Sequence, residues 1–144
     1  MMRRSKRLQV VLDLAKRKEE EALKALQIAQ GSLSKQNQKL QELIQYQRDY
    51  QQALRDAYQA HTTAESCATY QHFLAQVGNA IEQQQQAVAL AEQQFDKHRQ
   101  LWLTLHEKQQ GMGSLIDRFR DEEDRVLDKK EQKMIDELSQ RKRY

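Results

Sequence analysis

The sequence predicts an all-α fold, a long antiparallel two-helix coiled coil that forms a helical hairpin. Proline is absent from the 144 residues, and 24 of them are glutamine. Apolar residues recur at alternating steps of four and three, which keep one stripe of an α-helix facing a partner. Strong helix formers make up well over half of the chain. A net charge of only +3 and the lack of proline argue against disorder.

The first helical arm is expected from about residue 5 to about residue 60. Twelve of the 15 positions in its stripe are apolar or tyrosine, so the register is sustained over the whole arm. The stripe consists of Leu8, Leu12, Ala15, Glu19, Ala22, Leu26, Ala29, Leu33, Gln36, Leu40, Leu43, Gln47, Tyr50, Leu54 and Ala57.

A turn is expected at about residues 61–69, in the segment HTTAESCAT. Its three threonines and one serine are weaker helix formers that compete for backbone hydrogen bonds. A short connection makes two striped helices antiparallel neighbours, because each can then bury its stripe against the other.

The second arm is expected from about residue 70 to about residue 140. Thirteen of the 17 stripe positions are apolar or aromatic. Gly111 and Gly113 lie inside this pattern and predict a bend or a local loosening. The stripe consists of Tyr70, Leu74, Val77, Ile81, Gln84, Val88, Ala91, Phe95, His98, Trp102, Leu105, Gln109, Met112, Ile116, Phe119, Glu123 and Val126.

The two arms differ in length, which leaves part of the second arm unpaired. If the turn is centred near residue 65, Leu8 falls opposite about residue 122. The chain after that point forms a C-terminal overhang without an intramolecular partner. We therefore expect a single coiled-coil domain over residues 1–144 with an overhang from about residue 122.

Composition and motifs argue against an enzyme. A hydrophobic fraction of 38% and an aromatic fraction of 6% leave little material for a thick core with a deep pocket. No phosphate-binding loop and no nucleophile motif occurs in the sequence. The four histidines and Cys67 are too scattered for metal ligation. We expect no catalytic residue, no metal, no cofactor and no small-molecule substrate.

The sequence also predicts a cytosolic location. No apolar run approaches the roughly 20 residues of a membrane span. Asp13 and Lys16 interrupt the first apolar stretch, so it does not resemble a secretory signal. A lone Cys67 agrees with a reducing compartment. We expect no direct membrane insertion.

Basic residues cluster near the two chain ends, which an antiparallel hairpin places at one end of the molecule. This positive tip could dock in an acidic cavity or on phosphates. Acidic runs at residues 19–21 and 121–124 oppose binding to nucleic acid. The basic residues are Arg3, Arg4, Lys6 and Arg7 at the start and Arg141, Lys142 and Arg143 at the finish.

Three apolar residues, Tyr46, Phe73 and Ala80, lie beside the stripe rather than in it. A two-helix packing covers only part of such residues. Exposed aromatics next to a polar rim are typical of protein docking surfaces.

Five stretches of the chain resemble the flagellar export protein family FliJ. The resemblance implies a cytoplasmic, non-enzymatic component of the flagellar type III export apparatus, peripheral to the membrane at its base. It also implies a fold similar to the stalk of rotary ATPases, entry into the hexameric export ATPase, contact with the cytoplasmic part of the export gate, and interaction with export chaperones. The stretches are RLQVVLDLAKRKEEEA, LQELIQYQRDY, YQHFLAQVGNAIEQQ, the region of Trp102, and EQKMIDELSQR.

The resemblance further implies which residues contact the partners. The gate-contacting residues are Leu43, Tyr46 and Tyr50 on the first arm and Phe73, Val77 and Ala80 on the second. Gln84 stands where the family can show histidine, and Lys39 replaces a glutamine. The basic residues at the two ends are the candidates for contact with the ATPase.

Two alternatives fit the same architecture. The chain could be the corresponding stalk of a virulence-type secretion system, which sequence chemistry alone does not separate from the flagellar one. It could also be a coiled-coil scaffold that self-assembles through its seam and carries nucleic acid on its basic tip.

Overall fold

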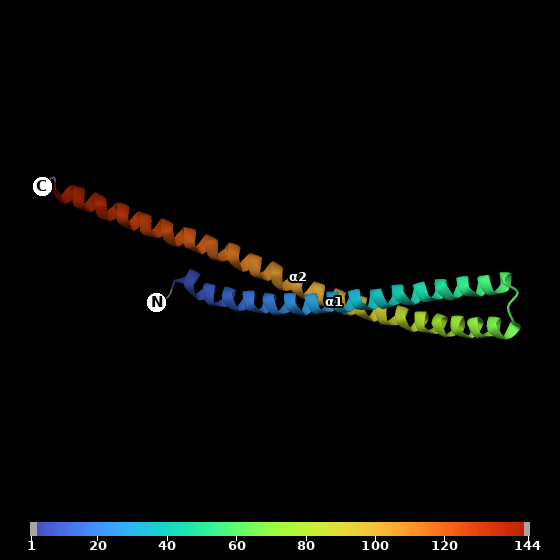
Figure 1. Cartoon of the computed structure of the whole chain (residues 1–144). Helices are drawn as coiled ribbons and strands as arrows, with labels where there is room; N and C mark the ends of the chain where they lie inside the picture. Colours follow the sequence, from blue (N-terminus) through green and yellow to red (C-terminus); the bar gives the residue numbers. More distant parts are fainter. Residues whose placement is uncertain (1–2, 143–144) are drawn as a thin grey trace. The chain divides into compact units, whose positions relative to one another are not determined.

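The computed structural model of the chain describes residues 3–142 and contains two helices over that range (Figure 1). Helix α1 spans Arg4–Gln59, 56 residues, and helix α2 spans Ala64–Lys142, 79 residues. Contacts divide the chain into two units. Unit 1 comprises Met1–Ala22 and Leu101–Tyr144, and unit 2 comprises Leu23–Gln100.

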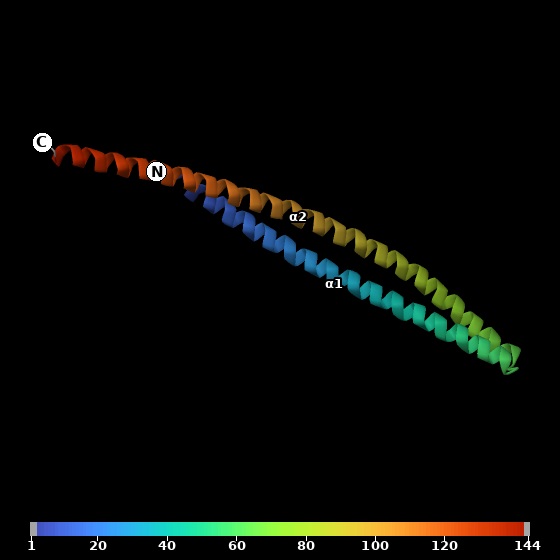
Figure 2. The same cartoon turned by 90° about the horizontal axis from the view of Figure 1, so that it is seen from above.

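Within unit 2 the two helices lie side by side and are joined by the short connection at residues 60–63 (Figures 1 and 2). Contacts between residues far apart in the sequence show that they run antiparallel. Gln84 Nε2 donates to Gln36 Oε1 at 2.7 Å and to the Gln36 carbonyl oxygen at 2.9 Å. The rings of Tyr50 and Phe73 stack with centroids 5.7 Å apart.

Within unit 1 the beginning of α1 packs antiparallel against the later part of α2. Ser5 contacts Glu123, and Glu19 contacts His106. Ile116, with 2% of its surface exposed, is the largest fully buried side chain of the described chain.

Most buried residues of both units are those of the predicted stripes; Ser5 and Cys67 are buried outside them. All 15 stripe positions of the first arm and 16 of the 17 of the second are buried or partly buried. The exception, Val126, is 52% exposed. The predicted fold class, an all-α antiparallel two-helix hairpin, is confirmed.

A long exposed stretch of α2 follows the packed part of unit 1. Every side chain described from Asp124 to Arg141 is exposed, although the backbone stays helical to Lys142. This segment carries apolar residues without cover at Leu127, Met134 and Leu138. The sequence placed the beginning of the overhang at about residue 122.

The connection is shorter than the segment 61–69 expected from the sequence, because α2 already begins at Ala64. Two of the three threonines that suggested a loop, Thr63 and Thr69, instead make hydrogen bonds to α2. Thr63 Oγ1 accepts a hydrogen bond from the Ser66 backbone N–H at 3.2 Å, which caps α2. Thr69 Oγ1 donates to the Glu65 carbonyl at 3.0 Å within the helix.

Helix α1 ends in a Schellman motif that contains no glycine. The Thr62 N–H donates to the Ala57 carbonyl at 3.1 Å, and the His61 N–H donates to the Tyr58 carbonyl at 3.3 Å. His61, which supplies the second of these donors, has a φ of 54°, a left-handed conformation that favours glycine. This motif lets the chain reverse within four residues.

The expected bend at Gly111 and Gly113 does not interrupt α2, which is helical through both residues. A Cβ atom added at either glycine would meet nothing within 4 Å. Neither position therefore requires glycine for close packing. The surrounding contacts of the seam outweigh the weak helix propensity of two glycines.

Replacing His61 by glycine should stabilise the hairpin by about 0.5–1 kcal/mol, because it relieves the left-handed strain at some cost in unfolded-state entropy. Urea unfolding followed by circular dichroism measures the change. As a control, Gln59→Gly should destabilise, because residue 59 is helical and gains nothing from glycine. A His61→Gly variant less stable than the parent would show that the imidazole contributes more than its backbone conformation costs.

Candidate protein-interaction sites

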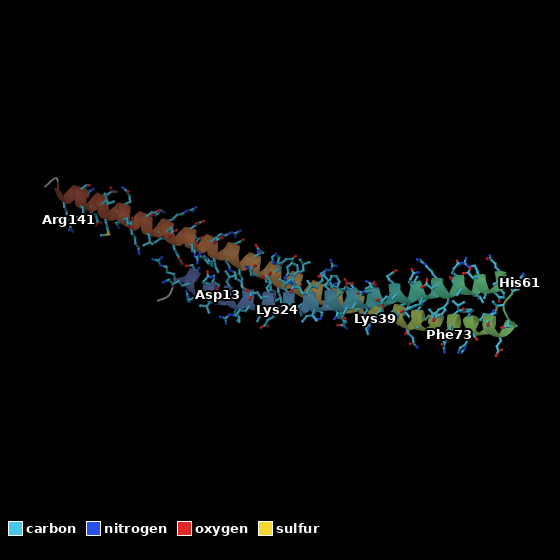
Figure 3. The ribbon with its side chains drawn as sticks, in the orientation of Figure 1. Asp13, Lys24, Lys39, His61, Phe73 and Arg141 are labelled. Carbon is cyan, nitrogen blue, oxygen red and sulfur yellow. The ribbon has the colours of Figure 1, made fainter. Side chains whose placement is uncertain are left out.

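The structure places an aromatic patch near the turn of unit 2. Tyr46 is 58% exposed and Phe73 is 40% exposed, whereas Tyr50 is half-buried. Phe73 stacks on Tyr50 across the two helices with an angle of 20° between the ring planes. Figure 3 shows Phe73 on α2, close to the end of the unit that carries His61. The stacking fixes the Phe73 ring against Tyr50, and Phe73 nevertheless remains accessible to solvent.

Burial distinguishes the remaining residues of the expected gate surface. Leu43, Val77 and Ala80 are all partly buried, and the first two occupy seam positions. The exposed area of this set of residues therefore comes mainly from Tyr46 and Phe73. Position within or beside the stripe agrees with this division except at Ala80, which lies beside the stripe and is partly buried.

His72 belongs to the same patch, although the sequence reasoning did not include it. Its ring lies 6.2 Å from that of Phe73 and is tilted by 50°. The sequence feature that could have identified His72 is its position beside Phe73, within residues 66–81, which contain no Asp, Glu, Lys or Arg. In a chain with 31% charged residues, that stretch has no formal charge whose desolvation would oppose burial.

The basic residues at the start of the chain lie in unit 1. Arg3, Arg4, Lys6 and Arg7 are exposed. The Arg4 guanidinium lies 5.8 Å from the centroid of the Phe119 ring, a cation–π contact that orients it against α2.

The basic residues near the C-terminus do not lie beside those at the start of the chain. Ser5 contacts Glu123, and Arg141 lies eighteen residues further along α2, about 27 Å along a helix. The exposed stretch of α2 therefore separates the two ends of positive charge. Of the other expected residues, Lys142 is described only as part of the helix, and Arg143 lies outside the described residues.

A carboxylate of α2 caps the beginning of α1. The Ser5 hydroxyl donates to Glu123 Oε2 at 2.7 Å, and the Ser5 backbone N–H donates to Oε1 at 3.2 Å. This satisfies one of the free N–H groups in the first turn and places negative charge at the positive end of the helix dipole. Glu123 thereby anchors the first turn of α1 to α2.

The same contacts perturb the acidity of the carboxyl. The hydrogen bond from the Ser5 side chain holds the pKa of Glu123 below its ordinary value. Partial desolvation opposes this effect, while the Ser5 N–H and the charges of Arg3 and Arg120 reinforce it.

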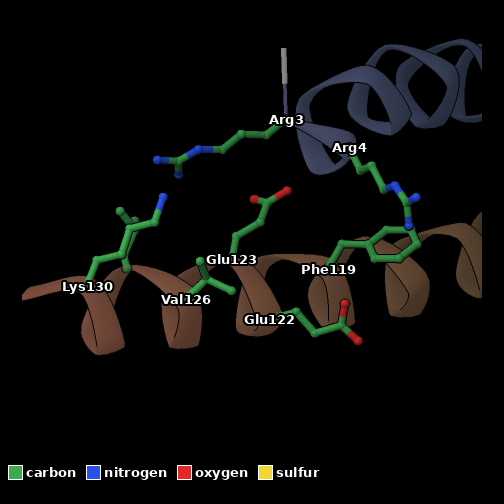
Figure 4. Close-up of a pocket in the computed structure, with 8 residues that line it drawn as sticks. Arg3, Arg4, Phe119, Glu122, Glu123, Val126 and Lys130 are labelled. Atoms are coloured by element: carbon green, nitrogen blue, oxygen red, sulfur yellow. The ribbon is translucent and has the colours of Figure 1, made fainter. Parts of the chain in front are cut away.

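A pocket of about 400 Å³ opens beside this cap (Figure 4). Arg3, just before α1, and Lys130 of α2 extend into the same part of it. No ion pair joins either of these two side chains to an acidic group in the described part of the chain. The apolar lining consists of Phe119, Val126 and Leu127.

Unit 1 also contains a polar cluster within the seam. His106 Nδ1 lies 2.7 Å from Glu19 Oε1, and the His106 ring stacks on Trp102 with centroids 5.0 Å apart. The buried Trp102 Nε1 has no hydrogen-bond partner among the described residues. At Glu19 a polar contact with His106 takes the place of the apolar contact expected in the seam. Such a polar pair specifies which residues of the two helices face one another.

Over residues 3–142, no group of three or more His, Cys, Asp or Glu could hold a metal ion. The same range contains no helix with the length and apolar content of a membrane span.

The fold defines a helical hairpin protein, whose two helices pack along an apolar seam and leave aromatic and basic side chains exposed. A family model described as Flagellar FliJ protein matches residues 4–143. The chain therefore belongs to the FliJ family and has a role associated with flagellar export, as a non-catalytic component that interacts with other export proteins. No curated protein and no solved structure matches it.

The cap predicts a pH dependence of stability. Because the folded-state pKa of Glu123 is lowered, its contribution is present above the ordinary glutamate pKa of about 4.3 and is lost as the pH falls through the folded-state pKa. Between about pH 7 and about pH 3, the thermal midpoint of Glu123→Gln should fall less than that of the parent.

The exposed neighbour Glu122 provides the matched control, because replacing it removes the same charge without removing the cap. Glu122→Gln should retain the pH profile of the parent. Identical profiles for all three proteins in circular dichroism melts would contradict a stabilising cap.

Proposed function

We propose that the chain is a stalk that links the hexameric flagellar export ATPase to the cytoplasmic part of the export gate and also meets export chaperones. Its place of action would be the cytoplasmic face of the membrane, at the base of the export apparatus. Family membership supports the flagellar setting. The exposure of two aromatic residues beside the seam supports the gate contact.

The gate-binding surface is assigned to Leu43, Tyr46, Tyr50, Phe73, Val77 and Ala80. The observation that carries this assignment is that Tyr46 and Phe73 remain exposed while their neighbours in the stripe are covered. Aromatic side chains of this kind contribute large contact areas and often dominate binding. The absence of formal charge along residues 66–81 lowers the desolvation cost of docking there.

The ATPase-binding surface is assigned to the basic residues Arg3, Arg4, Lys6 and Arg7, with Arg141, Lys142 and Arg143 at the finish. The exposure of the first four supports their availability to an acidic partner. A single asymmetric helix pair inside a sixfold ring cannot contact six subunits alike. It therefore biases the nucleotide states of some subunits and couples hydrolysis to the gate.

Replacing Tyr46 and Phe73 together by alanine should weaken binding to the purified cytoplasmic part of the gate about tenfold or more, because both lose buried aromatic area in the complex. Isothermal titration calorimetry measures the affinity. Helicity by circular dichroism should stay near that of the parent, since both residues are exposed.

Tyr58→Ala is the control for that experiment. Tyr58 is also an exposed tyrosine of α1, but its hydroxyl accepts a hydrogen bond from Gln71 at 3.0 Å and it lies outside the assigned surface. Its replacement should leave gate affinity unchanged. Unaltered affinity in the double variant would remove the gate assignment, and an equal loss of helicity would make Tyr46 and Phe73 structural residues.

Charge reversal tests the ATPase contact. The parent should promote assembly and turnover of the purified export ATPase, and Lys6→Glu combined with Arg7→Glu should reduce both effects several-fold. Lys16→Glu combined with Arg17→Glu changes the net charge equally at exposed positions of the same helix and should retain them. No effect of the parent at saturating concentration would remove the stalk proposal.

A further inference from the structure

An apolar groove lies on unit 2, outside the surfaces assigned above. It has a volume of about 380 Å³. Alanines from both helices line its inner part: Ala25 and Ala29 from α1, and Ala87 and Ala91 from α2. These four residues are buried or partly buried, and two of them, Ala29 and Ala91, are seam positions. The groove therefore lies directly over the seam between the two helices.

Two large apolar side chains line the groove without being covered themselves. Ile28 of α1 is 74% exposed, more than any other large hydrophobic side chain in the described part of the chain. Leu90 of α2 is 59% exposed. Each helix thus supplies one large apolar side chain beside the small alanines. Small residues along a groove let a third helix approach the pair closely.

The lining carries no Asp, Glu, Lys or Arg among the described residues, although such residues make up 31% of the sequence. Its polar members are Ser32, Gln36, Gln94 and His98. A partner with charged residues beside its apolar stripe would have to desolvate those charges without a counter-charge in the groove. A partner with uncharged polar flanks avoids that cost and can hydrogen-bond to the glutamine side chains.

We propose that this groove docks one amphipathic helix of another protein, whose apolar stripe is flanked by uncharged polar residues. On α1 the lining runs from Ala25 to Gln36, about 17 Å along a helix, or three turns. That length matches three or four apolar residues of a partner at helical spacing. The docked helix would continue the packing of the seam, because two of the alanines that it covers, Ala29 and Ala91, already belong to the interface between α1 and α2.

This site is independent of the proposed stalk function. None of its lining residues belongs to the assigned gate surface or to the basic ends. Loss of binding at the groove would leave the gate and ATPase contacts intact, and the reverse also holds.

Three fluorescein-labelled synthetic helical peptides test the proposal with the full chain. They share a three-turn leucine stripe and differ only in flanking residues, which are glutamine, lysine or glutamate. Fluorescence anisotropy at nanomolar peptide concentration should show binding of the glutamine peptide and at least tenfold weaker binding of both charged peptides. Equal binding of all three peptides, or no binding, would overturn the proposal.

Variants of the chain locate the site. Ile28→Glu and Leu90→Glu should each weaken binding of the glutamine peptide at least tenfold, and Ile28→Ala should weaken it less. Val10→Glu, also at a highly exposed apolar position but in unit 1, should have no effect. Circular dichroism melts confirm that each variant is folded.

A second copy of the chain is the competing occupant. Sedimentation velocity over a range of concentrations should show no dimer that depends on Ile28. If the parent dimerises and Ile28→Glu abolishes the dimer, the groove is a self-association surface and the proposal is wrong.

Discussion

The antiparallel register of the two helices is the constraint on which the other features depend. Stripes made mainly of apolar residues could pair in several registers, because one heptad resembles the next. The polar pairs Gln36–Gln84 and Glu19–His106 remove this ambiguity. A slip by one heptad would separate both pairs and leave partly buried polar groups without partners. Each pair therefore specifies the register within its own unit.

The register also decides which apolar residues stay exposed. Tyr46 and Phe73 are each displaced from the stripe, so the packing that buries Tyr50 leaves them accessible. The same logic applies at Ile28, which precedes the buried Ala29 by one residue. Positions next to the stripe are thus available for binding without weakening the seam. This explains how a chain with a thin core can still present apolar surface.

Sequence periodicity was sufficient for the fold because one physical requirement, burial of a stripe, determines which residues meet. Periodicity was insufficient at the helix ends, because single hydrogen bonds determine where each helix begins and ends. Nothing in HTTAESCAT identifies His61 as the left-handed residue, and Thr63 looked like a loop residue although it caps α2. Glu123 is a polar residue within the predicted apolar stripe, and the sequence does not show that its carboxylate caps α1 from α2. Such contacts depend on which residues the register brings together.

The distribution of charge separates two ways of binding. Contacts made by exposed basic side chains such as Lys6 and Arg7 weaken with salt, because the Debye length at physiological ionic strength is only about 8 Å. The aromatic patch and the groove in unit 2 are lined largely by uncharged residues, so apolar area is the main driving force that they offer. Burial of that area responds little to moderate salt. Of the proposed contacts, those of the basic end should therefore weaken with salt, whereas those of the aromatic patch and the groove should change little.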